Sequence, residues 1–309
     1  RFRDDYQATT VLSKLPPPAE SDALRASALL KLAETEVDSH LVNQQWSPAT
    51  DFPPAFAKLE CLGVPIEKIR SVLREMLGRC PSLKTLDSRL IWTSGASVTF
   101  GRSLASPETK AELGRFVTPK LAHALAALEG DLNPLLPSQP WFLIPGNLVS
   151  TVPKNITTDR TMAMGADINT VFQRALGSDI ARRLLPFGID LSDQGMNQRY
   201  CARAHIDKSA TIDLKNASNR VLLFPVVQAF PNDWVEMFLT LREPYGTIER
   251  RNDVLTKGSS TTEWFEYAML SSMGNGFTFE VETALFFAIC KACGAEDYEI
   301  CVYGDDIIV

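Results

Sequence analysis

The feature that most constrains the fold is a pair of adjacent aspartates between two apolar runs. Asp305 and Asp306 follow Gly304, with the run 298–302 before them and the run 307–309 after them. Apolar, β-branched runs separated by a Gly-Asp turn predict a β-hairpin. Since such strands should be buried, the two carboxylates would lie at the edge of a core, where their repulsion requires a cation. Carboxylate oxygens favour Mg²⁺ or Mn²⁺.

A third carboxylate occurs in a similar setting. Asp213 lies near the end of the strand-like run 210–214 and precedes Asp305 by 92 residues (305 − 213). If the two strands are neighbours, these aspartates can hold two metal ions for in-line phosphoryl transfer. The spacing alone leaves that adjacency open, and an Asp-rich turn is also common in proteins without any metal.

Composition narrows the class of protein. The chain has 309 residues, 45% hydrophobic and 22% charged, which is typical of one large or two ordinary globular domains and excludes a disordered chain. A net charge of −6 argues against coating nucleic acid by charge alone. The segment 154–220 nevertheless has ten Lys or Arg against seven Asp or Glu, so a local basic channel is compatible with this total. No apolar run is long enough to span a membrane, and no secretion signal opens the sequence.

Six cysteines in a chain of this length predict a reducing compartment rather than a disulfide framework. Cys290 and Cys293 form a CxxC pair, but a structural zinc site normally needs four ligands, and no second pair accompanies it. The favoured interpretation is two helix residues, one turn apart, that face a core.

The predicted elements form an α+β protein. Helices are expected at 21–37, at 66–77 and from Thr118 and Pro119 to a stop at Gly130, with the Thr118 hydroxyl as cap. Five prolines in 131–153 mark a change to extended segments, and 277–293 predicts a buried helix. The sequence starts at Arg1 without Met and stops at Val309 inside a predicted strand, which we interpret as truncation at both ends.

Four segments, in order, resemble the motifs of viral RNA-directed RNA polymerases. Residues 303–306 (YGDD) resemble motif C, 211–219 (TIDLKNASN) motif A, 271–280 (SSMGNGFTFE) motif B, and 151–155 (TVPKN) with 158–160 (TDR) the basic motif F. The sequences of these segments are most similar to the replicase catalytic subunit of the levivirus group. Three further segments resemble the same group: 190–194 (DLSDQ), 197–199 (NQR) and 94–96 (SGA). The resemblance is close from about residue 150 onward and loose before it.

The resemblance implies a right-hand polymerase with fingers and palm. It divides the chain into an N-terminal helical region with part of the fingers (1–145), fingers with the basic motif (146–205) and palm (206–309), with the thumb missing. The implied catalytic and metal-binding groups are Asp213, Asp305, Asp306 and the backbone carbonyl of Leu214. The implied nucleotide-binding residues are Lys154, Arg160, Ser218, Asn219, Gly274 and Asn275.

Three positions depart from the family pattern. Asn219 stands where Asp usually recognises the ribose 2′-hydroxyl, and Asn can still donate or accept a hydrogen bond there. We hypothesise that ribose selection is retained in weakened form. Thr157 replaces a frequent second Lys, and Gly165 replaces a frequent Glu.

The function implied by the resemblance is template-directed RNA synthesis from NTPs, by two-metal-ion nucleotidyl transfer with Mg²⁺ or Mn²⁺. RNA template and product are the implied partners, host translation factors are further ones, and the implied location is the cytoplasm of a bacterial host. The alternatives are a non-enzymatic RNA-binding or scaffold protein derived from a truncated polymerase, a reverse transcriptase and, less favoured, a nucleotide cyclase. Ser218 and Asn219 disfavour the reverse transcriptase, which usually has an aromatic residue there.

Overall fold

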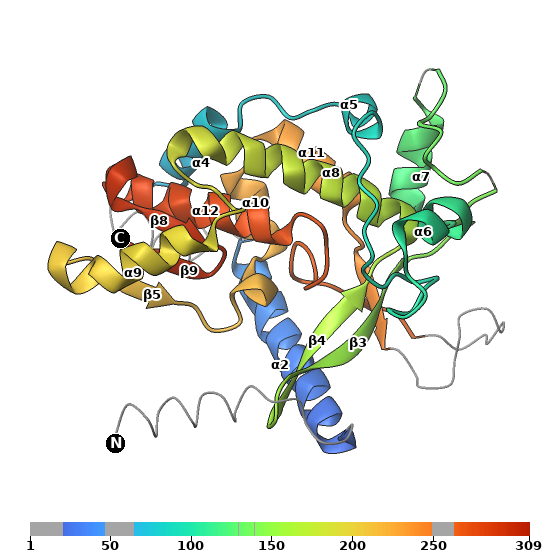
Figure 1. Cartoon of the computed structure of the whole chain (residues 1–309), viewed down its shortest axis with the longest axis horizontal. Coiled ribbons are helices and arrows are strands. Elements are labelled where there is room, and N and C mark those ends of the chain that lie inside the picture. The colour runs from blue at the N-terminus through green and yellow to red at the C-terminus, as the bar shows by residue number, and fades with distance from the viewer. Residues whose placement is uncertain (1–20, 47–64, 129, 139, 249–262) are drawn as a thin grey trace.

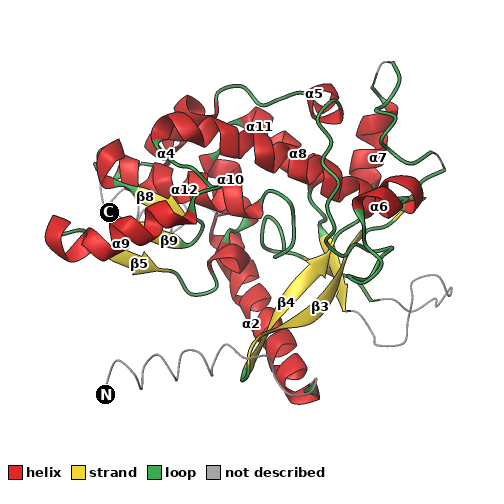
Figure 2. Cartoon of the chain, viewed as in Figure 1, coloured by secondary structure: helices red, strands yellow, loops and turns green. Residues whose placement is uncertain are grey.

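The computed structural model describes residues 21–46, 65–128, 130–138, 140–248 and 263–309, which form a mixed helix-and-sheet protein (Figures 1 and 2). Its α-helices are α2 (Asp22–Trp46), α4 (Ile66–Leu77), α5 (Leu83–Asp87), α6 (Pro107–Leu113), α7 (Pro119–Ala126), α8 (Asp167–Leu184), α9 (Gln194–Asp207), α10 (Leu223–Ala229), α11 (Asn232–Leu241) and α12 (Thr278–Ala292). Short 3₁₀ turns are η1 (Leu185–Phe187), η2 (Ala217–Arg220) and η3 (Asp297–Glu299). None of the helices in these residues is long and apolar enough to cross a membrane.

The strands in the described part of the chain form three small sheets. A parallel pair joins β1 (Phe116–Val117) to β2 (Phe142–Leu143). A second sheet has the order β4-β3-β6-β7, made of β3 (Gly146–Asn155), β4 (Thr158–Met164), β6 (Tyr245–Ile248) and β7 (Phe265–Glu266). The third has the order β5-β9-β8, made of β5 (Thr211–Asp213), β8 (Cys301–Tyr303) and β9 (Asp306–Ile308).

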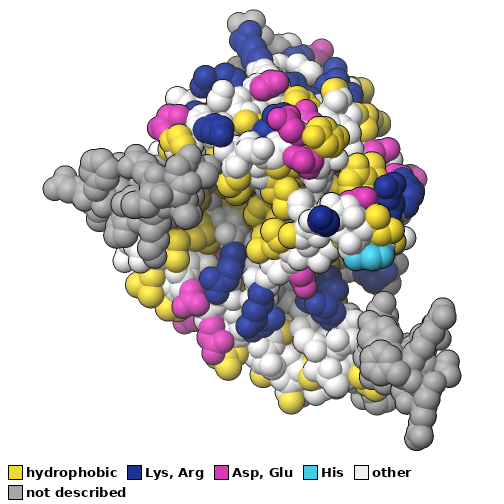
Figure 3. Space-filling view, turned by 90° about the vertical axis from the view of Figure 1, so that its left-hand side faces the viewer, with side chains coloured by type: hydrophobic (Ala, Val, Ile, Leu, Met, Phe, Trp, Pro, Cys, Tyr) yellow, Lys and Arg dark blue, Asp and Glu magenta, His cyan; other side chains and the backbone are white. Residues whose placement is uncertain are grey.

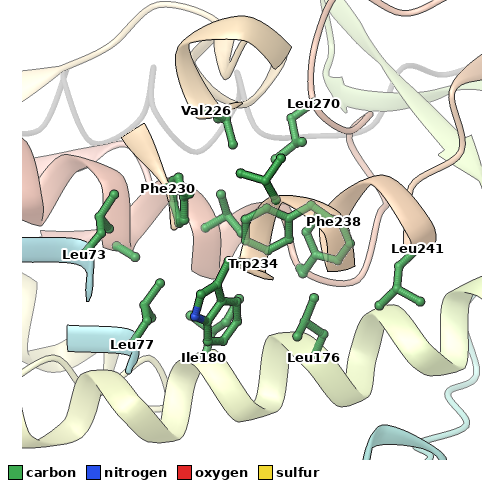
Figure 4. Packing of buried hydrophobic residues seen from close by; sticks show 14 of the residues in the cluster. Leu73, Leu77, Leu176, Ile180, Val226, Phe230, Trp234, Phe238, Leu241 and Leu270 are labelled. Atoms are coloured by element: carbon green, nitrogen blue, oxygen red, sulfur yellow. The ribbon is translucent and has the colours of Figure 1, made fainter. Parts of the chain in front are cut away.

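The main core lies where α4, α8, α11 and α12 pack together around Trp234 (Figure 4). Leu77 and Ile180 are fully buried beside it, and its indole nitrogen donates to the Gly78 carbonyl at 2.9 Å. The Arg183 guanidinium lies 5.2 Å from the ring centroid. The buried Trp234 side chain therefore keeps its polar atom satisfied, as buried indoles generally require.

Helix α2 lies against β4 and α10 rather than in the main core (Figure 1). Ala28 and Leu32, one turn apart, face inward. Further along, Glu36 accepts from the Ala268 amide at 2.7 Å and Asn43 donates to the Ala268 carbonyl at 2.6 Å. These two polar contacts attach the helix to a chain segment more than 200 residues away.

Most elements expected from the sequence are confirmed. The helix at 66–77 is α4, the helix at 277–293 is α12 with slightly tighter bounds, and the helix at 21–37 is the first part of the longer α2. Strands 210–214 and 307–309 correspond to β5 and β9. Extended structure in the proline-rich segment is confirmed by β2 and the start of β3.

Some details were wrong. Thr118 does precede α7, but its hydroxyl accepts from the Asn169 side chain at 2.8 Å instead of capping the helix, because a buried amide of α8 competes for it. The helix ends at Ala126, before Gly130. Tyr298 lies in η3 and is exposed, so the strand begins only at Cys301.

The interpretation of Cys290 and Cys293 as two helix residues facing a core was correct for Cys290 only. Cys290 packs against the core from α12, whereas Cys293 follows the last helical residue and is exposed.

Candidate active site

The sheet β5-β9-β8 joins the two aspartate-bearing segments. Its register pairs Asp213 with Asp306 and Asp306 with Tyr303, and Asp305 occupies the turn after Gly304. Residues directly opposite each other in an antiparallel sheet project from the same face. The adjacency that the sequence spacing left open is therefore present in the structure.

The local geometry of the turn explains the residue types. Gly304 has a φ of +63°, a left-handed conformation that disfavours side chains. A Cβ atom there would lie 2.3 Å from Cε2 of Phe279, whose ring packs edge-on against Tyr303 with centroids 5.0 Å apart. Only glycine fits between the turn and α12.

The carboxylates influence one another. Burial raises the pKa of Asp306, and the nearby charges of Asp305 and Asp213 raise it further. A bound cation would relieve this repulsion, and carboxylate oxygens are the donors that hard divalent ions prefer, so the residues suit Mg²⁺ or Mn²⁺ in kind. Within the described part of the chain, no three His, Cys, Asp or Glu side chains gather as a ready metal-binding group.

A pocket of about 440 Å³ opens beside the turn. Its walls are α2, the β3–β4 hairpin, the segment 213–219, Met273 and Asp305. Seven residues predicted from the sequence line it: Lys154, Arg160, Asp213, Leu214, Ser218, Asn219 and Asp305. The structure thus brings the predicted nucleotide-binding cations to the same cavity as three of the four predicted metal-binding residues, Asp213, Leu214 and Asp305.

The pocket carries both signs of charge. It is lined by three carboxylates, Asp159, Asp213 and Asp305, and by four basic side chains, Lys31, Lys154, Arg160 and Lys215. None of the four cations forms an ion pair with another residue that the structure describes. Figure 3 shows Lys and Arg side chains gathered around a hollow in one face of the molecule. Unpaired cations can bind phosphate groups without first losing a protein partner.

Lys31 was missed by sequence reasoning. It lies on α2, one residue before buried Leu32, and reaches the pocket because α2 packs against β4. The sequence predicts the helix but gives no sign of its partner.

Gly274 and Asn275 lie outside the lining of this pocket, where Met273 takes their place. Gly274 has a φ of +114°, and a Cβ there would lie 2.4 Å from the Ala163 carbonyl oxygen of β4. The Asn275 side-chain nitrogen is buried without a hydrogen bond of normal geometry, yet it lies near enough to Glu243 to lower the pKa of that carboxyl. Asp306 does not line the pocket either. The nucleotide-binding roles of Gly274 and Asn275 stay predictions.

Glu243 is a second residue that the sequence did not single out. It is fully buried and accepts from the Gln173 side chain at 2.8 Å and the Ala166 amide at 3.2 Å. Burial raises its pKa to about 7. A Cβ at Gly165 would lie 2.7 Å from its Oε1 atom, so the Glu243 carboxylate occupies the space next to the position where the family pattern often has a Glu.

Glu282 of α12 is the third. It is 1% exposed, and one of its oxygens accepts from the Ser218 hydroxyl at 3.0 Å. Burial raises its pKa to about 7, with a further contribution from the charge of Asp305.

Comparison with known proteins decides the family. The family model described as RNA replicase, beta-chain, matches residues 1–309. This chain belongs to that family.

Individual replicase chains are similar over 78–100% of this chain. The RNA-directed RNA polymerase subunit beta of Escherichia virus Qbeta is 31% identical over 316 residues, covering all of this chain and 51% of the relative. The RNA-directed RNA polymerase beta chain of Escherichia phage MS2 is 30% identical over 297 residues, covering 92% of this chain and 51% of the relative. The beta chain of Enterobacteria phage fr is 32% identical over 251 residues, covering 78% and 44% respectively. The chain spans about half the length of the curated relatives it matches.

Proposed function

We propose that this replicase chain carries the fingers and palm of an RNA-directed RNA polymerase, which extends RNA on an RNA template from NTPs. The observation that supports this best is the pairing of β5 with β9, which sets Asp213 opposite Asp306 beside a pocket that also contains Lys154 and Arg160. The family relationship favours the same activity, because the matched relatives are named RNA-directed RNA polymerases.

In the proposed reaction, one group of pocket residues binds the nucleotide and another group holds the metal ions. Lys154 and Arg160 bind the triphosphate of the incoming nucleotide, the first as a point charge and the second through forked donors. Ser218 and Asn219 face the ribose, with Gly274 and Asn275 behind them. Asp213, Asp305, Asp306 and the Leu214 carbonyl would hold two Mg²⁺ or Mn²⁺ ions. When bound, such ions would supply the positive charge that lowers the pKa of the primer 3′-hydroxyl and neutralises the leaving pyrophosphate.

According to this proposal, the protein acts in the cytoplasm of a bacterial host. Its partners are the RNA template and product, with host translation factors as additional ones. The division into 1–145, 146–205 and 206–309 is part of the same proposal. The core extends across these boundaries, because α4 packs directly against α12. The parts are thus expected to fold together rather than separately.

Primer extension by the full-length replicase tests the function. Asp305→Asn should abolish RNA synthesis and leave RNA binding unchanged, because the substitution removes a charge from the metal-binding face and alters no basic residue. Asp207→Asn is the matched control, since Asp207 forms an ion pair with Arg203 at an exposed part of α9. If Asp305→Asn extended RNA as well as the wild type, the catalytic assignment would be wrong.

The same assay separates the alternatives. A scaffold protein would bind RNA with no synthesis by the wild type, and a reverse transcriptase would prefer dNTPs to NTPs.

A further inference from the structure

Two neighbouring residues of α12 contact two separate segments of the candidate active site, the segment after β5 and the turn between β8 and β9. Glu282 accepts from the Ser218 hydroxyl at 3.0 Å, and Ser218 lies five residues after Asp213. Thr283 accepts from the Gly304 amide at 2.9 Å, immediately before Asp305. A single helix turn therefore holds the segment after β5 and the turn between β8 and β9.

The Thr283 contact has a defined direction. Its hydroxyl donates to the Phe279 carbonyl at 2.8 Å, so its lone pairs remain to accept from Gly304. Gly304 is buried in the turn, and a buried amide without a partner is costly. The hydroxyl thus satisfies the amide and fixes the height of the turn above α12.

The Glu282 contact is not what packing alone would select. The side chain is 1% exposed, and its Oε1 atom has no hydrogen-bond partner among the described residues. A buried carboxylate satisfied on one side only costs free energy, and an apolar side chain of similar size would fill the space more favourably. Retaining an acid here is explained by the serine it holds.

We propose that Glu282 and Thr283 are positioning residues, which use α12 to fix the separation between the Asp213–Ser218 segment and the Asp305 turn. This inference rests on the proposed polymerase function. Neither residue contacts substrate on this proposal. Thr283 sets the position of the carboxylate at the turn, and Glu282 sets the orientation of the hydroxyl that faces the ribose.

Binding of Mn²⁺ to the 309-residue chain, measured by electron paramagnetic resonance, tests the Thr283 contact without requiring catalysis. Thr283→Val keeps the shape and removes the hydroxyl, and should weaken Mn²⁺ binding roughly tenfold, as is typical when a group that orients a metal ligand is removed. Thr283→Ser keeps the hydroxyl and should bind as the wild type does. The matched control is Thr240→Val on α11, because Thr240 makes the same type of bond to the carbonyl four residues earlier, away from the site.

Nucleotide selection by the full-length replicase tests the Glu282 contact. Glu282→Met removes the acceptor and should lower the preference for NTP over dNTP severalfold, whereas Glu282→Gln retains an acceptor and should preserve it. Thermal unfolding of each variant identifies any that fail to fold. If Thr283→Val is one of them, the Glu282 pair decides the matter alone.

The outcomes separate the two proposals. Equal Mn²⁺ binding by the wild-type chain and by the Asp305→Asn variant would refute the metal site itself. Wild-type binding that depends on Asp305 but is equal in folded Thr283→Val, or is lost in folded Thr283→Ser, would overturn the positioning role. Unchanged nucleotide preference in folded Glu282→Met would overturn the positioning role of Glu282.

Discussion

Replacing Gly304 by alanine tests the geometry of the aspartate turn directly. The φ of +63° places the residue in the left-handed region, where a side chain costs about 1–2 kcal/mol. The new Cβ would also lie 2.3 Å and 2.8 Å from two ring carbons of Phe279, and such overpacking costs about 1–3 kcal/mol. We therefore expect Gly304→Ala to lower the free energy of unfolding by about 2–5 kcal/mol, measured by urea denaturation.

A matched glycine isolates the two contributions. Gly188 has a φ of +78°, and a Cβ there would meet nothing within 4 Å, so Gly188→Ala should show the backbone strain alone, about 1–2 kcal/mol. Phe279→Leu combined with Gly304→Ala should recover the packing part, as a coupling of about 1–3 kcal/mol in a double-mutant cycle. Equal losses for the two alanine variants, with no coupling to Phe279, would refute the reasoning.

Three further predictions concern the pocket and the buried acid. Lys31→Ala should weaken NTP binding to the chain roughly threefold to tenfold in a titration, because it removes one unpaired cation from the pocket; Lys68→Ala, an exposed lysine on α4, should have no effect. Asn219→Asp should increase the preference of the full-length replicase for NTP over dNTP, and identical discrimination would contradict a ribose contact. Burial raises the Glu243 pKa from 4.5 to about 7, so the folded state favours the protonated carboxyl. The contribution of this group to protein stability is therefore complete below pH 4.5 and is lost as the pH rises to 7. The free energy of unfolding should fall over this range by up to about 3 kcal/mol, at 1.36 kcal/mol per pKa unit, and less steeply in Glu243→Gln.

The turn that carries Asp305 and Asp306 could be predicted because its signal is local. Glycine and paired acids between apolar runs predict a turn at a core edge, and β8 and β9 have this arrangement. Helix 66–77 could be predicted for the same reason, since its apolar residues recur at helical spacing. The pairing of Asp213 with Asp306 needed the structure, because no sequence spacing determines which strands become neighbours.

The remaining residues of the site depend on contacts between distant segments. Lys31 reaches the pocket only through the packing of α2 on β4, and Glu282 is recognisable only by the serine it faces. Thr118 shows the opposite error, because a correct local rule was overridden when Asn169 competed for the hydroxyl. Local patterns thus identified residues that follow a turn or strand signal, and missed residues whose place depends on a partner far away in the sequence.

The distance along the chain between the walls of the pocket has a consequence for folding. Lys31 and Asp305 are 274 residues apart (305 − 31), so the cavity closes only after the last strand pair has been synthesised. At 5–20 residues per second, this leaves roughly 14–55 s between the two walls leaving the ribosome. Helix α2 can pack earlier, against β4 and α10, so the wall that contains Asp305 is expected to complete the pocket last.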